Sequence, residues 1–181
     1  MRMETSDEAL ALAAALGDRE AFAALLARHY ERILRLGWRL LGSAAEAEDL
    51  AQDICLALPA KLGGFRGEAR FTTWLHRVVV NAAHDRRRRA ATRAKAADGW
   101  GEWEIARRAA DEEAAEAADW LARAMGALAP DLRDTVALVL GEAMTHREAG
   151  AILGVSEGTV SWRMSEVKKH LKALAAAEGM A

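Results

Sequence analysis

The sequence predicts an all-α protein made of two small helical domains. Hydrophobic residues make up 52% of its 181 residues, and alanine, the strongest helix former, supplies many of them. Only two prolines are present and β-branched residues are sparse, which disfavours strands. Apolar residues also recur at helical spacing over most of the chain. We expect a first domain over 5–92, a linker over 93–117 and a second domain over 118–176.

Two helices open the first domain. A short helix is predicted from Asp7 to Leu16, and a longer one to about Leu41. Asp18 is expected to cap the longer helix, because its carboxylate can accept hydrogen bonds from the first free backbone N–H groups. Gly42 is expected to end it, since glycine is common just past a helix C-terminus.

Two more helices complete the first domain. Ser43 precedes a glutamate by three residues, which is a capping box for a helix over 44–58. Pro59 is expected to disrupt the end of that helix. After a glycine-rich loop around Phe65, a fourth helix is predicted to begin near Thr72 and to continue into a run of four arginines.

The predicted linker is acidic. Residues 96–118 hold seven Asp or Glu and two Arg, and they lack apolar periodicity, which favours a partly helical spacer. Trp100 and Trp103 are unexpected in such a segment. Docking on one of the domains explains them more simply than partner binding. The second domain then begins with a helix over 119–128 and another that starts at Pro130, at a first-turn position that proline favours.

The segment 145–174 carries the most specific pattern in the chain. A capping box at Thr145 begins a short helix, Gly154 ends it, and Ser156 caps a final helix that runs to about Ala175. This is the helix-turn-helix pattern, in which the second helix enters the major groove of DNA. A plain helical hairpin is the alternative.

The final helix has one apolar and one polar face. The apolar face consists of Val160, Met164, Val167, Leu171 and Leu174. The opposite face, named the recognition face here, consists of Ser161, Trp162, Ser165, Lys169 and Lys172, with Arg163 and Lys168 at its edges. Cations suit phosphates, Arg163 suits guanine edges, and Trp162 suits a sugar or a thymine methyl group. The pattern predicts DNA binding, with a merely solvated basic face as the alternative.

Five side chains align along the predicted fourth helix. They form the fourth-helix stripe, which consists of Trp74, Arg77, Asn81, His84 and Arg88. An aromatic ring, an amide and cations are the groups that hold unstacked bases and phosphates. Structural explanations remain open: Trp74 can be partly buried, Asn81 can bridge two helices, and successive arginines often form a solvated helix end.

The predicted third helix separates apolar from acidic side chains. The inward face consists of Ala47, Leu50, Ala51, Ile54 and Leu58. The outer face carries Asp49, Gln52 and Asp53 around an exposed Leu56. Carboxylates around an apolar side chain suit a protein partner with basic rims, although a solvated acidic face is equally consistent with the pattern.

Composition disfavours several classes of protein. The single cysteine, Cys55, rules out an internal disulfide and a cysteine-rich zinc site, and its position predicts a buried structural thiol. His84 and Asp85 form a pair like that of metal-dependent phosphohydrolases, but the other histidines are not spaced to complete a metal site. Neither a signal peptide nor an apolar run of about 20 residues is present. We therefore expect no enzyme, no cofactor and no metal, and a soluble, cytoplasmic protein without membrane insertion.

These motifs, in this order, resemble the extracytoplasmic-function (ECF) group of bacterial RNA polymerase sigma factors. Residues 18–92 resemble region two through AEDLAQDICLAL, FRGEARFTTWL and Asn81. Residues 119–175 resemble region four through LAPDLRDTVAL and ILGVSEGTVSWRM. The resemblance implies a factor that binds core RNA polymerase, recognises and melts promoter DNA, and starts transcription. It also implies an anti-sigma factor that covers the same surfaces.

The resemblance also implies a partner for each surface. Core polymerase would meet Glu48, Asp49, Gln52, Asp53 and Leu56. The minus-ten element would meet the loop residues Phe65, Arg66 and Arg70 together with Trp74, Arg77, Asn81, His84 and Arg88. The minus-thirty-five element would meet Glu157, Thr159, Ser161, Trp162, Arg163, Ser165, Lys168, Lys169 and Lys172. Trp162 stands where a small or basic residue is frequent in the group, so the promoter sequence is not implied.

Two other functions remain open at this point. A helix-turn-helix regulator could bind operators without polymerase, using its first domain to sense a ligand or to dimerise. A helical adaptor is a second possibility, but it would leave the fourth-helix stripe and the recognition face without a purpose. Co-elution with core RNA polymerase distinguishes these alternatives from a sigma factor.

Overall fold

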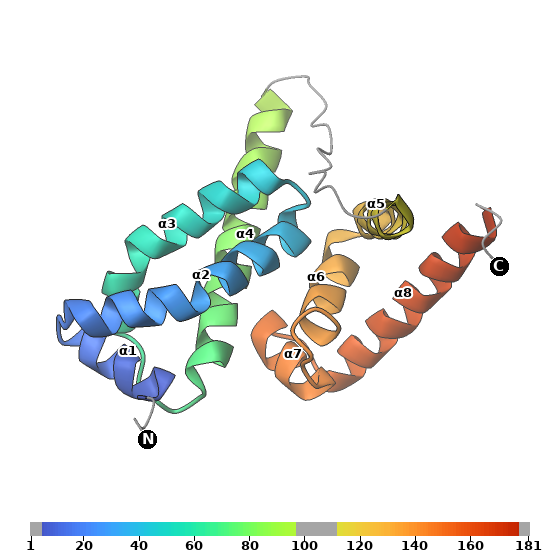
Figure 1. Cartoon of the computed structure of the whole chain (residues 1–181). Coiled ribbons are helices and arrows are strands. Elements are labelled where there is room, and N and C mark those ends of the chain that lie inside the picture. Colours follow the sequence, from blue (N-terminus) through green and yellow to red (C-terminus); the bar gives the residue numbers. More distant parts are fainter. Residues whose placement is uncertain (1–4, 97–111, 178–181) are drawn as a thin grey trace.

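The computed structural model describes residues 5–96 and 112–177, which form eight helices and no strand (Figure 1). The helices are α1 (Asp7–Ala15), α2 (Arg19–Leu41), α3 (Ala44–Leu62), α4 (Phe71–Ala96), α5 (Glu112–Ala127), α6 (Pro130–Val139), α7 (His146–Leu153) and α8 (Glu157–Ala177). Helices α1–α4 form the first domain and α5–α8 the second. The predicted all-α fold is confirmed; Trp100 and Trp103 lie outside the described residues.

The predicted helix starts in the first domain are confirmed by their capping bonds. The carboxylate of Asp18 accepts hydrogen bonds from the backbone N–H groups of Glu20 and Ala21, at 2.9 and 3.0 Å. The hydroxyl of Ser43 accepts from the third residue of α3 at 3.3 Å. Gly42 ends α2 in the left-handed region, with a φ of 77°, which glycine adopts without steric strain.

Helix α3 contradicts one prediction, because it continues through Pro59 to Leu62 instead of ending near Leu58. Proline removes one backbone donor and crowds the preceding turn, which destabilises a helix. Both Leu58 and Leu62 are buried, however, with 2% and 0% of their surface exposed. Burial of these side chains, one on each side of the proline, offsets the local cost.

Helix α1 is attached to the rest of the first domain by a partly buried ion-pair cluster. The carboxylate of Asp7 lies 2.8 Å from Nε2 of His29 and 2.9 Å from the guanidinium of Arg28. The neighbouring carboxylate of Glu8 accepts a hydrogen bond from the backbone N–H of Phe71 at 3.0 Å, at the start of α4. One short helix therefore fixes both α2 and the beginning of α4.

The second domain is built around the predicted helix-turn-helix. Both bonds of the capping box are present, since Thr145 Oγ1 accepts from Glu148 N at 3.2 Å and the Glu148 carboxylate accepts from Thr145 N at 2.9 Å. Gly154 ends α7 in the left-handed region, and Ser156 Oγ accepts from the backbone of Thr159 at 3.1 Å. The apolar face of α8 is buried as expected at Val160, Met164 and Val167.

The two domains pack against each other, α6 along α2 and α7 along α4. The apolar cluster of the first domain continues into the second through Ala137, Leu138, Ala149, Ile152 and Val160. A smaller apolar cluster of the second domain lies between α6 and α8. Helix α4, which carries the fourth-helix stripe, therefore contacts helices of both domains, α2 in the first and α7 in the second. No helix within the described ranges is long and apolar enough to cross a membrane.

We predict that Gly150→Ala destabilises the second domain. A Cβ atom at this position would lie 2.7 Å from the carbonyl oxygen of Val155, in the turn between α7 and α8. The backbone has to shift, so we expect a loss of about 1–3 kcal/mol in the free energy of unfolding. Gly158→Ala is the matched control, because its Cβ meets nothing closer than 3.8 Å. Urea denaturation followed by circular dichroism measures both; equal stabilities would contradict the crowded turn.

A second prediction concerns acid stability. Burial acts to raise the pKa of Asp7, but the hydrogen bonds and charges of Arg28 and His29 outweigh it and hold this pKa below its ordinary value. A carboxyl with a lowered pKa stabilises the folded state above its ordinary pKa, of about 4, and that contribution is lost as the pH falls through the lowered value.

Asp7→Asn should therefore cost about 1 kcal/mol at neutral pH, and the deficit should disappear in acid. Thermal melts of both proteins across this pH range measure it. A deficit that stays constant with pH would show that the charge of Asp7 is not what stabilises α1.

Candidate nucleic-acid interface

The recognition face of α8 is open to solvent. Trp162 has 59% of its surface exposed, and the other four members of the face are exposed as well. The ammonium group of Lys169 lies 2.6 Å from the carboxylate of Glu166 on the same helix, an exposed pair that contributes little. An exposed tryptophan among hydroxyls and cations is available to contact a groove without any rearrangement of the fold.

Arg163 lies off this face. Its side chain is only 16% exposed, and its guanidinium lies 3.4 Å from the carboxylate of Asp131 in α6. The expectation that Arg163 reads guanine edges therefore does not fit this arrangement. The physical reason is its position beside the buried Met164, which places it between α6 and α8. Lys168, at the other edge, is exposed.

The N-terminal end of α8 is occupied by capping and cross-helix bonds. The hydroxyl of Thr159 lies 2.9 Å from that of Ser156, within the cap, and Glu157 lies 3.6 Å from Arg147. Nδ1 of His146, the first residue of α7, lies 2.8 Å from Oγ of Ser161. The sequence did not predict this hydrogen bond between α7 and α8, because only the geometry of the turn brings positions 146 and 161 together.

The fourth-helix stripe is divided between open and covered members. Arg77, Asn81 and Arg88 are exposed, whereas Trp74 and His84 are partly buried. Arg77 donates a hydrogen bond to the carbonyl of Ala151 in α7 at 3.2 Å. Nε2 of His84 lies 2.8 Å from the carboxylate of Asp134 in α6, and Arg88 pairs with Asp85 at 2.6 Å. The second domain therefore engages two of the five members.

Phe65 differs from the expectation that it faces DNA, because only 6% of its surface is exposed. The centroid of its ring lies 5.7 Å from that of Phe71 and 5.6 Å from that of Trp74, and both ring pairs have an edge-to-face geometry. Such aromatic contacts favour burial of all three rings. Arg66 and Arg70, on the same loop, are exposed.

The outer face of α3 is acidic and exposed around an apolar centre. Leu56 is 82% exposed, and the residues of the two preceding helical turns that are also exposed include Glu48, Asp49, Gln52 and Asp53. Sequence reasoning did not anticipate that Arg86 of α4 reaches two of these carboxylates, at 2.7 Å from Asp49 and 3.1 Å from Asp53. Cys55, next to this face, is only half-buried, which differs from the buried thiol that was predicted, and this partial burial raises the pKa of the thiol.

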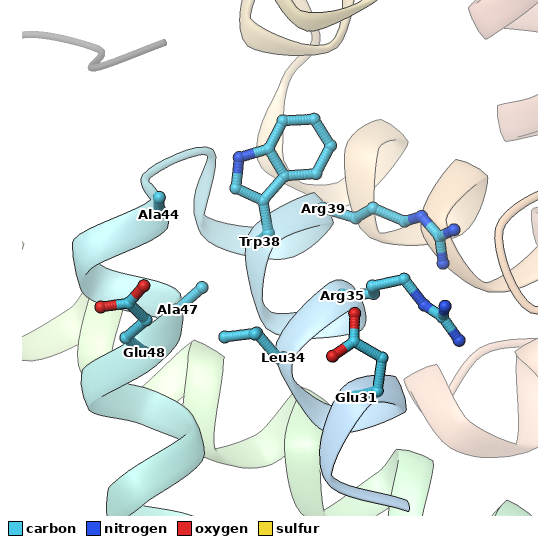
Figure 2. A pocket seen from close by; sticks show the side chains of 8 residues that line it. All are labelled: Glu31, Leu34, Arg35, Trp38, Arg39, Ala44, Ala47 and Glu48. Atoms are coloured by element: carbon cyan, nitrogen blue, oxygen red, sulfur yellow. The ribbon is translucent and has the colours of Figure 1, made fainter. Parts of the chain in front are cut away.

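A groove of about 450 Å³ lies between α2 and α3, next to this acidic face. Figure 2 shows Trp38, Leu34 and Ala47 around it, with the carboxylates of Glu31 and Glu48 at its edges. Arg35 and Arg39 also line the groove, so its edges carry both signs of charge around an apolar floor. Such a groove can accept an apolar side chain flanked by charged or polar groups.

Comparison with known families identifies both domains. Residues 25–93 match the family described as sigma-70 region 2, and residues 124–173 match the family described as sigma-70, region 4.

Full-length relatives agree with these matches. The ECF RNA polymerase sigma factor SigM of Mycobacterium tuberculosis is 35% identical over 173 residues, which cover 96% of this chain and 86% of that protein. The RNA polymerase sigma factor CnrH of Cupriavidus metallidurans is 29% identical over 184 residues, which cover 96% of each.

Two solved structures share the fold. One is CnrH in complex with the cytosolic domain of CnrY, with a TM-score of 0.70 and 27% identity, covering 96% of this chain and 99% of that one. The other is the sigma factor RpoE of Bartonella quintana in complex with the anti-sigma factor NepR, with a TM-score of 0.77, covering 87% and 98%. The latter is 23% identical and supports the fold alone.

We predict that Lys169→Ala weakens binding of the chain to double-stranded DNA and lowers its salt dependence. Loss of one phosphate contact should reduce the slope of log affinity against log salt by about one. Fluorescence anisotropy with a labelled duplex at several salt concentrations measures this slope. Lys61→Ala, an exposed lysine at the end of α3, is the matched control. Equal slopes for both variants would remove Lys169 from the interface.

Proposed function

The chain belongs to the ECF group of RNA polymerase sigma factors, which direct core RNA polymerase to promoters, and from that premise we propose which of its surfaces meets which partner. Sigma factors act without a catalytic reaction of their own. The observation that carries the proposal is that each domain matches its own region of the family and presents a separate polar surface. We propose that the chain acts in the cytoplasm, which contains both the polymerase and the promoters.

Core polymerase is proposed to dock on the outer face of α3. Leu56 supplies an exposed apolar centre, and the carboxylates of Asp49 and Asp53 supply the rim. A partner with basic residues around an apolar pocket would complement this face, and charge complementarity would speed the encounter. Gln52 belongs to the same surface, and Glu48 extends it to the groove between α2 and α3.

The first domain, proposed to span 5–92, is assigned to the minus-ten element. Arg77, Asn81 and Arg88 of α4, with Arg66 and Arg70 of the preceding loop, offer cations and an amide along one exposed track. Trp74, which is partly buried, adds an aromatic ring on which an unstacked base can stack. Phe65 is assigned a supporting role instead, since it packs beneath Trp74.

The second domain, proposed to span 118–176, is assigned to the minus-thirty-five element. The recognition face of α8 would enter the major groove, where Trp162 and Ser161 can contact base edges and Lys169 and Lys172 can contact phosphates. The hydrogen bond between His146 and Ser161 would position the Ser161 hydroxyl for this contact. Arg163 can read guanine edges only if its ion pair with Asp131 breaks when the domain binds DNA.

An anti-sigma factor is the proposed regulator. The similar structure of CnrH was solved in complex with a second protein, the cytosolic domain of CnrY. The groove between α2 and α3 has an apolar floor and edges of two glutamates and two arginines, which supports a helical partner that places an apolar side chain in the floor. Co-elution with purified core polymerase tests the sigma assignment itself, because a helix-turn-helix regulator of another kind would elute separately.

We predict that Asn81→Ala lowers promoter-dependent transcription by purified core polymerase about tenfold or more, because a base contact contributes on the order of 1–3 kcal/mol. Polymerase binding should stay unchanged, since Asn81 lies on α4 and the docking face on α3. Run-off transcription on linear and on pre-melted templates measures the effect, with Glu31→Ala of α2 as the control. Full activity of the variant on both templates would exclude Asn81 from the minus-ten contact.

A further inference from the structure

The two serines of the recognition face have different hydrogen-bond partners. Ser161 and Ser165 are both exposed and lie about one helical turn apart on α8. The hydroxyl of Ser165 donates to the backbone carbonyl of Ser161 at 3.1 Å, within the same helix. The hydroxyl of Ser161 lies 2.8 Å from Nδ1 of His146 in α7, and in the described part of the chain it has no other hydrogen-bond partner.

The hydrogen bond between Ser161 and His146 can run in two directions. A hydroxyl group carries one proton and two lone pairs, and a neutral imidazole has one donor and one acceptor nitrogen. If Ser161 donates to Nδ1, its oxygen offers only lone pairs to DNA, and Nε2 carries the ring proton. If Nδ1 donates instead, the hydroxyl proton of Ser161 is free to bind a base. The direction of this bond therefore determines which base edges Ser161 can contact.

The second ring nitrogen of His146 distinguishes the two directions. Within residues 5–96 and 112–177, Nε2 has no hydrogen-bond partner and is not one of the buried unpaired atoms, so it is open to solvent. His146 is the first residue of α7 and is followed by Arg147, whose side chain is 86% exposed. The first helix of a helix-turn-helix lies across the DNA backbone, where phosphate oxygens accept hydrogen bonds. A phosphate at Nε2 of a neutral ring requires the proton there, which leaves Nδ1 as the acceptor for Ser161.

We propose that His146 fixes the Ser161 hydroxyl as a hydrogen-bond acceptor on promoter DNA, so that the recognition face selects bases that present an amino group in the major groove. Those bases are adenine and cytosine, whereas guanine and thymine present keto oxygens there. Ser165 meets the same requirement without His146, because its proton is already donated to the helix backbone. The proposal rests on the assignment of the recognition face to the minus-thirty-five element.

The other members of the recognition face cannot supply this selection. The indole of Trp162 and the ammonium groups of Lys169 and Lys172 are hydrogen-bond donors only. The hydroxyl oxygens of Ser161 and Ser165 are therefore the only side-chain acceptors among its five members. His146 acts through Ser161 and is thus a positioning residue, which affects base preference more than overall affinity.

The test begins with a selection by the full chain bound to core RNA polymerase. The probe is a pool of duplexes with a randomised segment upstream of a fixed sequence, and sequencing of the bound fraction gives the base preference at each position. Ser161→Ala and Ser165→Ala each identify the position that the missing hydroxyl reads. We expect each variant to lose a different preference, of about three- to tenfold, as for one net hydrogen bond.

Base analogues then determine the direction of the contact. At the Ser161 position, the amino group is removed by placing purine for adenine or pyrimidinone for cytosine, and in a second duplex the paired base lacks its keto oxygen instead. Removal of the amino group should lower the affinity of the wild-type complex about three- to tenfold more than that of Ser161→Ala. Removal of the keto oxygen should affect both complexes equally.

Substitutions of His146 test its role in this contact. His146→Phe should abolish the sensitivity to the amino group at the Ser161 position and leave the Ser165 position unchanged, because a phenyl ring does not accept the hydroxyl proton. His146→Asn should restore the sensitivity, since the amide oxygen takes the place of Nδ1. Arg147→Ala is the matched control, because loss of a cation next to His146 should weaken all duplexes uniformly. Circular dichroism checks that the helices are intact in each variant.

The outcomes separate this proposal from the function on which it rests. Equal sensitivity to the amino group in the wild type and in His146→Phe would overturn the role of His146. Sensitivity to the keto oxygen instead would show that Ser161 donates, which overturns its assignment as an acceptor. Unchanged preferences in Ser161→Ala would also overturn the proposal, but a preference altered by Trp162→Ala would keep the minus-thirty-five assignment. A wild-type complex that selects no base upstream would count against that assignment itself.

Discussion

The beginning of α4 is fixed by an aromatic cluster, and the positions of the other surfaces follow from it. Phe71, which is fully buried, contacts the rings of Phe65, Trp74 and His29 at centroid distances of 5.1 to 5.7 Å. Its backbone N–H is capped by Glu8. Because a helix is rigid over its length, fixing its first turn also fixes the register of the stripe, of the arginines beyond it and of the contacts with the second domain.

The parts of the fold that depend on local chemistry could be predicted from the sequence. Helix starts at Asp18, Ser43 and Thr145 follow from side chains that satisfy the first free backbone donors, and the structure has those bonds. The helix-turn-helix and the buried face of α8 follow from the same rules together with periodicity. The boundary at Pro59 could not be predicted, because burial of Leu58 and Leu62 against other helices decides it.

The candidate site was less predictable wherever two segments meet. A helical wheel places Arg163 beside the recognition face, but the wheel does not contain α6, whose Asp131 attracts it. The same holds for Phe65, a loop residue whose burial depends on contacts with two residues of α4, Phe71 and Trp74. The interdomain contacts of Glu142 span more than one hundred residues from Arg39, and no periodicity along the chain reports such a pairing.

The bridge from Arg86 to α3 has a thermodynamic consequence for the assembled complex. A basic partner that docks on Asp49 and Asp53 competes for the carboxylates that now neutralise this guanidinium. The released positive charge adjoins Arg87 and Arg88, where it would strengthen the attraction for phosphates. Linkage between two binding sites is reciprocal. Nucleic acid that binds Arg86 would therefore raise the affinity of the protein partner for Asp49 and Asp53 by the same factor. Two ligands on different helices would then cooperate through one side chain, without any change of fold.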